Sequence, residues 1–377
     1  MPPVSLAEKT GNEKSSLHAV RAKTLKALVL SGGKGTRLRP LTYTAAKQLL
    51  PVANKPILFY SLEAIAASGI HHVGIVVGET KDEIMSAVGD GSRWGLSVEY
   101  IAQEAPLGLA HAVKISRDFL GDSDFVVYLG DNLLCDGIDS LVDSFQREKP
   151  NAQILLAKVK NPNQFGVAEL RDNKVVHLEE KPQHPKTDLA LVGVYMFDRN
   201  VFDVIKDLRP SKRGELEITD AIQGLIDRKF TVTAHTVSGW WKDTGKLEDI
   251  LEANRLTLEL IEPKIHGNVD DSSRVEGRVS IAASARIINS TIRGPVSIEE
   301  GVVIKDSYIG PFTSLAQNVR VENSEVENTI ILPNAVVRGI SRIGSSLIGH
   351  GAEVSKLETR PKAYRIMIGD SSKVEIP

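Results

Sequence analysis

A short repeat in the C-terminal third of the chain restricts the fold more than any other feature. Four segments align when the sequence is written with a period of 17 residues: NSTIRGP, DSYIGPF, NSEVENT and ISRIGSS, starting at residues 289, 306, 323 and 340. Each has a serine at its second position and an aliphatic residue at its fourth. Such a period predicts a parallel β-helix, whose coils have three short sides. The alternative, a β-sandwich with accidental periodicity, does not account for four repeats in register.

Residues 25 to about 260 alternate strand-like and helix-like segments. The apolar runs KALVLSG, HHVGIVVGE and DFVVYLGDN are separated by helix-like segments such as PILFYSLEAIAASGI and TKDEIMSAVGDG. This pattern predicts an α/β domain with a Rossmann-like, mainly parallel mixed sheet. We expect three parts: a disordered extension over 1–24, an α/β domain over 25–262, and a β-helix domain over 263–377 that serves assembly or regulation.

Composition excludes several functional classes. The formal net charge is −2, so no overall field attracts nucleic acid or an anionic membrane, and no apolar run approaches the length of a membrane-spanning helix. The single cysteine, Cys135, excludes an intrachain disulfide and a cysteine-rich zinc site. His71 and His72 have no partner at metal-ligand spacing. We expect a cytoplasmic protein that forms a homo-oligomer.

The segment SGGKGTRLRP follows the first predicted strand and has the ingredients of a phosphate site. It matches neither G-x-x-x-x-G-K-[ST] nor G-x-G-x-x-G. However, its glycines at 32, 33 and 35 allow a ligand to approach exposed backbone N–H groups. Arg37 adds a planar fork for phosphate oxygens, and Lys47 adds a point charge. The alternative is a basic surface turn, which would also contain Lys34 and Arg39.

Two aspartates and a charged turn strengthen the phosphate hypothesis. Asp131 directly follows a buried strand, where ligands of α/β sheets bind, and Asp243 lies in the glycine-containing segment GWWKDTGK. Magnesium commonly takes one or two carboxylates together with substrate phosphates and water, so this pair predicts a Mg²⁺ site. In HLEEKPQHP, Lys181 suits a second anion and Glu180 suits sugar hydroxyls. Each of these residues is also common in ordinary turns.

Nine ordered motifs resemble the sugar-1-phosphate nucleotidyltransferases, and most closely the long thymidylyltransferases with a C-terminal left-handed β-helix. They are GGKGTRLRPLT, KQLLPVANKP, PLGLAHA, YLGDN, FGVAEL, EEKP, LVGVYMFD, RGELEITDAI and WWKDTGK. The resemblance implies that dTTP or UTP reacts with glucose 1-phosphate to give a nucleotide sugar and pyrophosphate. It further implies Mg²⁺ as the cofactor and in-line attack on the α-phosphorus without a protein nucleophile.

The resemblance also implies a role for individual residues. Catalysis would use Arg37, Lys47 and Lys181, while nucleotide binding would use Leu30, Gly32, Gly33, Gly35, Thr36, Gln103 and Gly108. The sugar and its phosphate would contact Gly166, Glu180 and Lys181, and the metal would bind Asp131 and Asp243. Short bacterial forms commonly have tyrosine before the glycine of FGV, whereas this chain has Phe165 and therefore lacks that hydroxyl.

Three alternatives remain open on the sequence. The same chemistry could use UTP, ATP or GTP with a mannose or N-acetylglucosamine phosphate. A bifunctional acyltransferase would require a catalytic histidine, for which the β-helix offers only His266 and His350. A regulatory protein without activity is disfavoured because Arg37, Lys181 and both aspartates are present. We interpret Thr219 or Asp220 as a helix N-cap, and Trp240 and Trp241 as packing residues.

Overall fold

The structure is a computed structural model that describes residues 24–33, 35–43, 45–172, 174–357 and 364–375. The predicted extension over 1–24 lies outside the described residues except for its last residue, Thr24, and Lys34 of the glycine-rich segment also lies outside them. None of the helices in the described ranges is long and apolar enough to cross a membrane.

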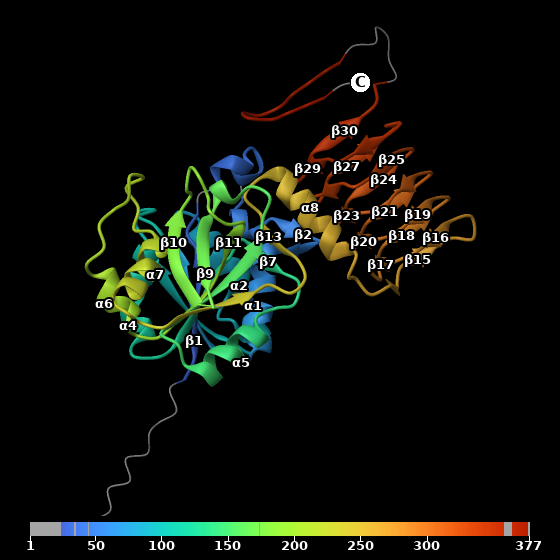
Figure 1. The fold of residues 1–377 in the computed structure, drawn as a ribbon. Helices are drawn as coiled ribbons and strands as arrows, with labels where there is room; N and C mark the ends of the chain where they lie inside the picture. The colour runs from blue at the N-terminus through green and yellow to red at the C-terminus, as the bar shows by residue number, and fades with distance from the viewer. Residues whose placement is uncertain (1–23, 34, 44, 173, 358–363, 376–377) are drawn as a thin grey trace, which may run out of the picture.

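A nine-stranded mixed sheet forms the centre of the α/β domain (Figure 1). Seven of its strands run in one direction, and β10 and β11 run opposite to them. In spatial order the strands are β5 (Ser97–Ala102), β4 (His72–Val77), β1 (Lys26–Ser31), β6 (Phe125–Leu129), β11 (Leu189–Phe197), β8 (Ala152–Lys158), β12 (Val232–Thr236), β10 (Lys174–Glu180) and β9 (Gly166–Arg171).

Helices cover both faces of this sheet, which explains why its strands read as continuous apolar runs. In β1, Ala27 and Val29 face one core while Leu28 and Leu30 face the other. One face is covered by α1 (Ile57–Ala67), α2 (Lys81–Val88) and α5 (Asp139–Glu148). The other is covered by α3 (Leu109–Ile115), α4 (Arg117–Leu120), α6 (Val201–Ile205) and α7 (Ile218–Asp227). The predicted α/β architecture is confirmed.

Short elements connect the sheet to the functional segments. Two small antiparallel pairs are formed by β2 (Pro51–Val52) with β3 (Lys55–Pro56), and by β7 (Asn132–Leu134) with β13 (Trp241–Asp243). The 3₁₀ turns are η1 (Thr36–Leu38), η2 (Leu41–Tyr43), η3 (Lys47–Leu49), η4 (Ser92–Trp94) and η5 (Pro162–Gln164). The last helix, α8 (Leu247–Leu258), leads into the C-terminal domain.

The C-terminal domain is a three-sided parallel β-helix. One side contains β14 (Lys264–Ile265), β17 (Val279–Ile281), β20 (Val296–Ile298), β23 (Thr313–Leu315), β26 (Ile330–Ile331) and β29 (Leu347–Ile348). The second contains β15 (Asn268–Val269), β18 (Arg286–Ile288), β21 (Val303–Lys305), β24 (Arg320–Glu322), β27 (Val336–Arg338) and β30 (Glu353–Ser355). The third contains β16 (Arg274–Glu276), β19 (Thr291–Arg293), β22 (Tyr308–Ile309), β25 (Glu325–Glu327) and β28 (Ile343–Gly344). This arrangement is consistent with a left-handed β-helix.

The predicted repeat sets the register of the third side. Ile292, Ile309, Val326 and Ile343 are stacked partners, so this side keeps the 17-residue period. Elsewhere one step is a residue shorter, as in the pairing of Leu315 with Ile331. The repeated serines also have a physical reason: the Ser290 hydroxyl accepts a hydrogen bond from the backbone N–H of Ser307 in the next coil, 3.1 Å away. Most of the stacked aliphatics fill one apolar core.

Candidate active site

The glycine-rich segment and Asp131 lie at the same edge of the sheet. Gly32 follows β1 directly, Asp131 comes two residues after β6, and β1 and β6 are parallel neighbours. The backbone N–H of Gly130 donates to the carbonyl oxygen of Leu30 at 3.0 Å, which ties the two strand ends together. The side chain of Leu30 itself packs in the core, so its backbone is the part directed toward the site.

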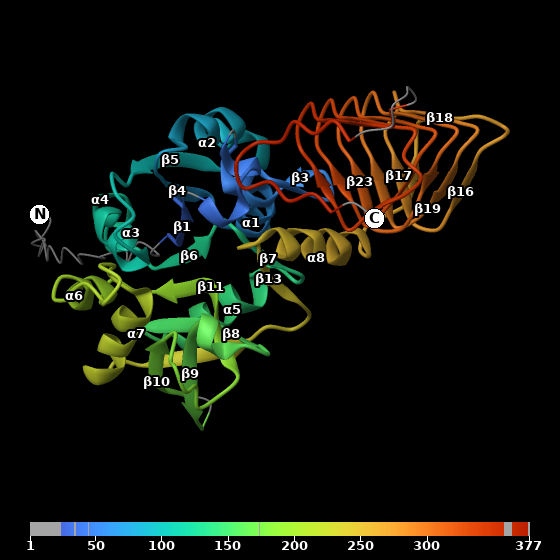
Figure 2. The same cartoon turned by 90° about the horizontal axis from the view of Figure 1, so that it is seen from above.

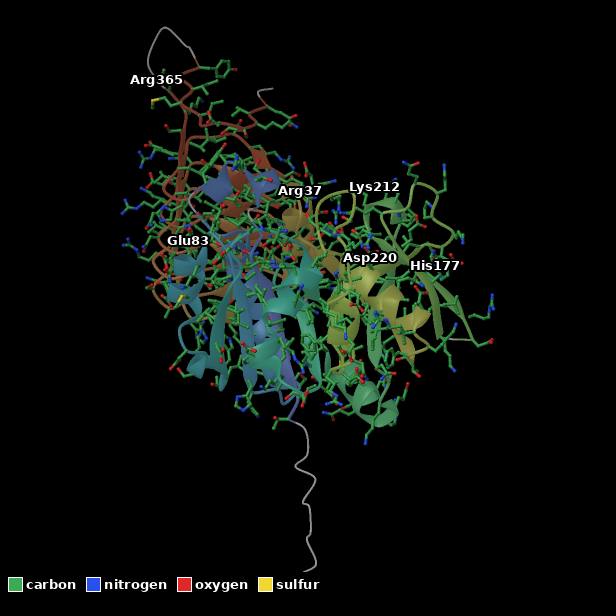
Figure 3. The ribbon with its side chains drawn as sticks, turned by 90° about the vertical axis from the view of Figure 1, so that its left-hand side faces the viewer. Arg37, Glu83, His177, Lys212, Asp220 and Arg365 are labelled. Atoms are coloured by element: carbon green, nitrogen blue, oxygen red, sulfur yellow. The ribbon has the colours of Figure 1, made fainter. Side chains whose placement is uncertain are left out.

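The glycine-rich segment is closely packed on its neighbours. Gly35 has a φ of 62°, and a Cβ there would lie 2.9 Å from the Cβ of Lys47. The Thr42 hydroxyl donates to the carbonyl oxygen of Gly35 at 2.7 Å. Glycine at 35 is therefore required by both backbone conformation and space. Thr36 and Arg37 begin η1 and are exposed, which leaves the Arg37 guanidinium accessible to a ligand (Figure 3).

Lys47 is buried and forms an ion pair with Asp131. Its backbone is held by α2, because the N–H of Ala46 donates to the Glu83 carboxylate at 2.5 Å. Burial raises the pKa of Asp131, but the Lys47 ammonium outweighs this and holds the pKa of that carboxyl below its ordinary value. Lys47, which is predicted to contact a substrate phosphate, is therefore already paired with Asp131 in this structure.

Asp243 is brought next to Asp131 by the pairing of β13 with β7, in which Asp243 lies opposite Asn132. The backbone N–H and hydroxyl of Thr244 donate to the carbonyl oxygen of Asp131 at 3.1 and 2.8 Å. The Asn132 amide donates to the Asp131 carboxylate at 2.9 Å and accepts from the indole N–H of Trp241 at 2.6 Å. Two segments more than 100 residues apart thus form one rigid unit.

The charges of this unit suit a hard divalent cation. Burial and the neighbouring Asp131 carboxylate raise the pKa of Asp243 to about 6, which means that one lysine does not neutralise both carboxylates. Among the described residues, no group of three or more His, Cys, Asp or Glu side chains forms an all-protein metal site. Two carboxylates that leave the other positions to water and phosphate fit a hard divalent cation rather than a structural zinc ion.

Gln103 lies on the other side of the glycine-rich segment. A Cβ at Gly32 would lie 3.2 Å from its Oε1. The Gln103 amide nitrogen lies 3.3 Å from the carbonyl oxygen of Gly108 and 3.0 Å from Nδ1 of His111. Gly108 has a φ of 103°, and a Cβ there would lie 2.3 Å from the carbonyl oxygen of Leu216. The segment from 103 to 108 is thus fixed at a rigid position beside Gly32.

The third predicted group lies on the far part of the sheet. Glu180 and Gly166 are paired across β10 and β9, and a Cβ at Gly166 would lie 2.6 Å from Cγ2 of Thr219. Burial raises the pKa of Glu180 despite the nearby cations. Lys181 has a φ of 46°, is exposed, and approaches the Glu180 carboxylate at 3.5 Å.

Sequence reasoning missed three residues around Glu180. The Thr219 hydroxyl donates to the Glu180 carboxylate at 3.2 Å, and the Arg213 guanidinium approaches that carboxylate at 3.4 Å and the buried Glu217 at 2.8 Å.

The prediction of Thr219 or Asp220 as N-cap is wrong, because α7 begins at Ile218 and the cap position is Glu217. The motif RGELEITDAI was the available signal, but its charge pattern resembles an ordinary helix start.

Aromatic packing connects the sugar-side residues to the carboxylate pair. The rings of Phe165 and Trp241 lie 5.4 Å apart with an interplanar angle of 65°. Trp240 packs in an apolar cluster with α8, so the predicted packing role is confirmed for this tryptophan. Trp241 does more than pack, since its indole N–H fixes Asn132.

Comparison with known proteins identifies the family. The sequence model of the nucleotidyl transferase family matches residues 26–259. The chain belongs to this family. A glucose-1-phosphate thymidylyltransferase from Streptomyces griseus is 54% identical over 353 residues, which cover 93% of this chain and 99% of the relative. A bifunctional protein GlmU from Methanococcus maripaludis is 38% identical over 331 residues. The match covers 86% of this nucleotidyltransferase and 77% of that protein.

A solved structure supports the fold of the N-terminal domain. A crystal structure of a protein assigned as a glucose-1-phosphate thymidylyltransferase from Bacillus anthracis, in complex with sucrose, is 37% identical with a TM-score of 0.60. The match covers 64% of this nucleotidyltransferase and 98% of that chain. The matched chain is therefore shorter than this nucleotidyltransferase.

The position of Gly108 gives a testable prediction. Gly108→Ala should raise KM for the nucleoside triphosphate about tenfold, because the new Cβ must displace either the 103–108 segment or Leu216. Gly121→Ala is the matched control, since Gly121 also has a positive φ (60°) but its Cβ would meet no atom within 4 Å. Steady-state kinetics of both variants check this. An equal rise in KM in the two variants would contradict it.

Proposed function

We propose that this nucleotidyltransferase converts dTTP and glucose 1-phosphate into dTDP-glucose and pyrophosphate. The observation that carries the proposal is the meeting of the glycine-rich segment, Lys47 and the two carboxylates at one edge of the sheet. The 54% identity to the Streptomyces thymidylyltransferase over nearly the whole of both chains supports the same substrates.

The reaction is a single displacement that needs no protein nucleophile. A phosphate oxygen of glucose 1-phosphate attacks the α-phosphorus of dTTP in line. The bond from the α-phosphorus to the oxygen bridging to the β-phosphate breaks, and that oxygen leaves with pyrophosphate. The protein contributes positioning and neutralisation of charge. Backbone N–H groups around Gly32, Gly33 and Gly35 would hold the triphosphate, and the exposed Arg37 would stabilise the leaving pyrophosphate.

Lys47 would act between the two substrates. It lies at the carboxylate pair and directly against Gly35, so its ammonium can neutralise an α-phosphate held by the glycine-rich segment. Asp131 and Asp243 would hold a divalent metal ion, which we propose to be Mg²⁺. When bound, that ion would supply charge neutralisation for the phosphates. The raised pKa of Asp243 fits this role, because a cation would favour its ionised form.

Glucose 1-phosphate would bind on the β9–β10 side. Glu180 would accept sugar hydroxyl groups, with the Gly166 backbone beside it, and the exposed Lys181 would contact the phosphate. Gln103 would read the pyrimidine edge. Thymine and uracil differ by one methyl group, which is worth about 1–3 kcal/mol, so we expect a preference rather than exclusion of UTP.

Acyltransferase activity is the second candidate, because a bifunctional relative is similar over most of this chain. The β-helix has two histidines, His266 and His350, which lie in its first and last coils. His350 contacts the side chain of Asn334 at 3.1 Å on the exposed surface. Both histidines are exposed, so we favour assembly or regulation as the function of the β-helix. We further propose that the protein is a cytoplasmic homo-oligomer that binds neither nucleic acid nor membranes.

A substrate panel tests the main proposal. Pyrophosphate release with Mg²⁺ should be fastest for dTTP with glucose 1-phosphate, and slower with UTP by about 10- to 100-fold. ATP, GTP and the phosphates of mannose or N-acetylglucosamine should be poor substrates. A preference for a purine nucleotide would overturn the role of Gln103, and no release with any pair would overturn the proposal.

The carboxylate pair gives a second test. Asp131→Asn and Asp243→Asn should each lower kcat by at least about 100-fold, because each removes a charged metal ligand. Asp136→Asn is the matched control, since Asp136 is an exposed aspartate of the same segment whose partner is Ser238. Circular dichroism checks that all three variants fold. Normal turnover of the first two variants would remove the metal assignment.

The assembly proposal is tested by solution mass. Light scattering coupled to size-exclusion chromatography should give a mass that is a multiple of the 41.0 kDa chain. A monomer at micromolar concentration would refute assembly as the function of the β-helix.

A further inference from the structure

One apolar cluster joins the α/β domain to the β-helix, and we name it the junction cluster. Its buried members are Leu38, Leu50, Val52, Ile57, Leu133, Ile250, Ala253, Ile330 and Leu332. Leu41, Tyr60, Trp240, Leu247, Leu251 and Leu347 pack against them while partly exposed. In Figure 2, α8 and the β2–β3 pair reach from the α/β domain to the face of the β-helix, where this cluster lies.

All three segments that form the phosphate end of the site contribute to the junction cluster. Leu38, which is fully buried, directly follows Arg37 in η1. Leu133 lies two residues after Asp131, and Leu247 lies four residues after Asp243 at the start of α8. The proposed functional side chains therefore come from segments whose apolar residues share one core.

The β-helix supplies the opposite wall of the cluster. Ile330 in β26, Leu332 and Leu347 in β29 belong to it. The neighbouring Ile331 belongs to the core of the β-helix instead, as expected for successive residues of a strand. Ile330 is 1% exposed and Ile331 is 0% exposed, so two adjacent isoleucines are equally buried in different cores.

Polar contacts fix the two domains in one relative position. The fully buried Asn254 of α8 accepts hydrogen bonds from the backbone N–H of Ala53 at 2.8 Å and from the Ser314 hydroxyl at 2.7 Å. Its amide group donates to the carbonyl oxygen of Phe312 at 3.0 Å. Asn54 donates to the Ser297 hydroxyl at 2.9 Å. Buried, directional bonds of this kind permit little sliding of one domain against the other.

We propose that the side of the β-helix containing the stacked strands β26 and β29 positions the catalytic groups, with Ile330 as the main positioning residue. Packing of Ile330 and Leu332 in the junction cluster supports the buried side of η1 and thereby orients Arg37 toward the leaving phosphates. The inference rests on the proposed role of Arg37 and the carboxylate pair. It gives the β-helix a function in the chemistry of its own chain, in addition to assembly.

The sugar side should be insensitive to this packing. Glu180 and Gly166 are held by β9, β10 and α7, whose apolar residues belong to a separate core, and the junction cluster contains no residue of these elements. A loss of support in the junction cluster should therefore change the step at the α-phosphorus but not the binding of glucose 1-phosphate. A lower kcat with an unchanged KM for glucose 1-phosphate therefore distinguishes positioning from general destabilisation.

Deletion of the β-helix is a poor experiment, because it would expose the whole junction cluster to water. Three point variants of the full chain test the inference more directly. Ile330→Ala shortens a side chain in the junction cluster, and Ile331→Ala removes the same atoms from the same strand in the β-helix core. Ile330→Val restores most of the lost volume.

Ile330→Ala should lower kcat about tenfold, with KM for glucose 1-phosphate within about twofold of wild type. Ile331→Ala should lower the melting temperature at least as much and leave kcat within about twofold, and Ile330→Val should recover most of the activity. Equal kcat in the two alanine variants, or a sugar KM that rises with the loss of kcat, would overturn the inference. Inactive wild-type protein would instead overturn the proposed function.

Discussion

The placement of two half-buried, like-charged carboxylates beside one buried lysine is the constraint on which the site depends. Asp131 is paired with Lys47, whereas Asp243 retains a pKa raised to about 6. Such a pair is costly unless further positive charge arrives, and the arrangement persists because β7–β13 pairing and the contacts of Asn132 and Thr244 hold it in place. We therefore expect the anionic substrates to bind together with a cation, whose positive charge would reduce the excess of negative charge at the two carboxylates.

The same edge of the sheet also links recognition of the two substrates. Leu216 accepts a backbone hydrogen bond from Ala110 and donates one to Leu107, which places the segment beside Gly108 in contact with the loop that leads to Thr219. Phe165 meets Trp241 on the other side. Backbone hydrogen bonds and one aromatic contact thus connect the base-side, sugar-side and metal-side residues.

The β-helix is bound to this unit by both apolar and polar contacts. Solenoids are stiff along their stacking direction, since each coil is hydrogen-bonded to the next one. A stiff body packed on η1 and α8 would be well suited to hold them.

The sequence by itself determined the elements with a strong local period: the 17-residue coils, the strands β1, β4 and β6, and the glycine-rich segment. It also identified the family through ordered motifs and, through them, the residues that gather around the sheet edge. It did not locate the start of α7, the contacts of Arg213 and Thr219 with Glu180, or the junction cluster. Hydrophobic period and turn composition report on neighbours along the chain, whereas Ile330 and Leu38 come from segments almost 300 residues apart. Only the tertiary structure decided that these two side chains share a core, because burial on the outer face of a β-helix requires a partner that the repeat does not encode.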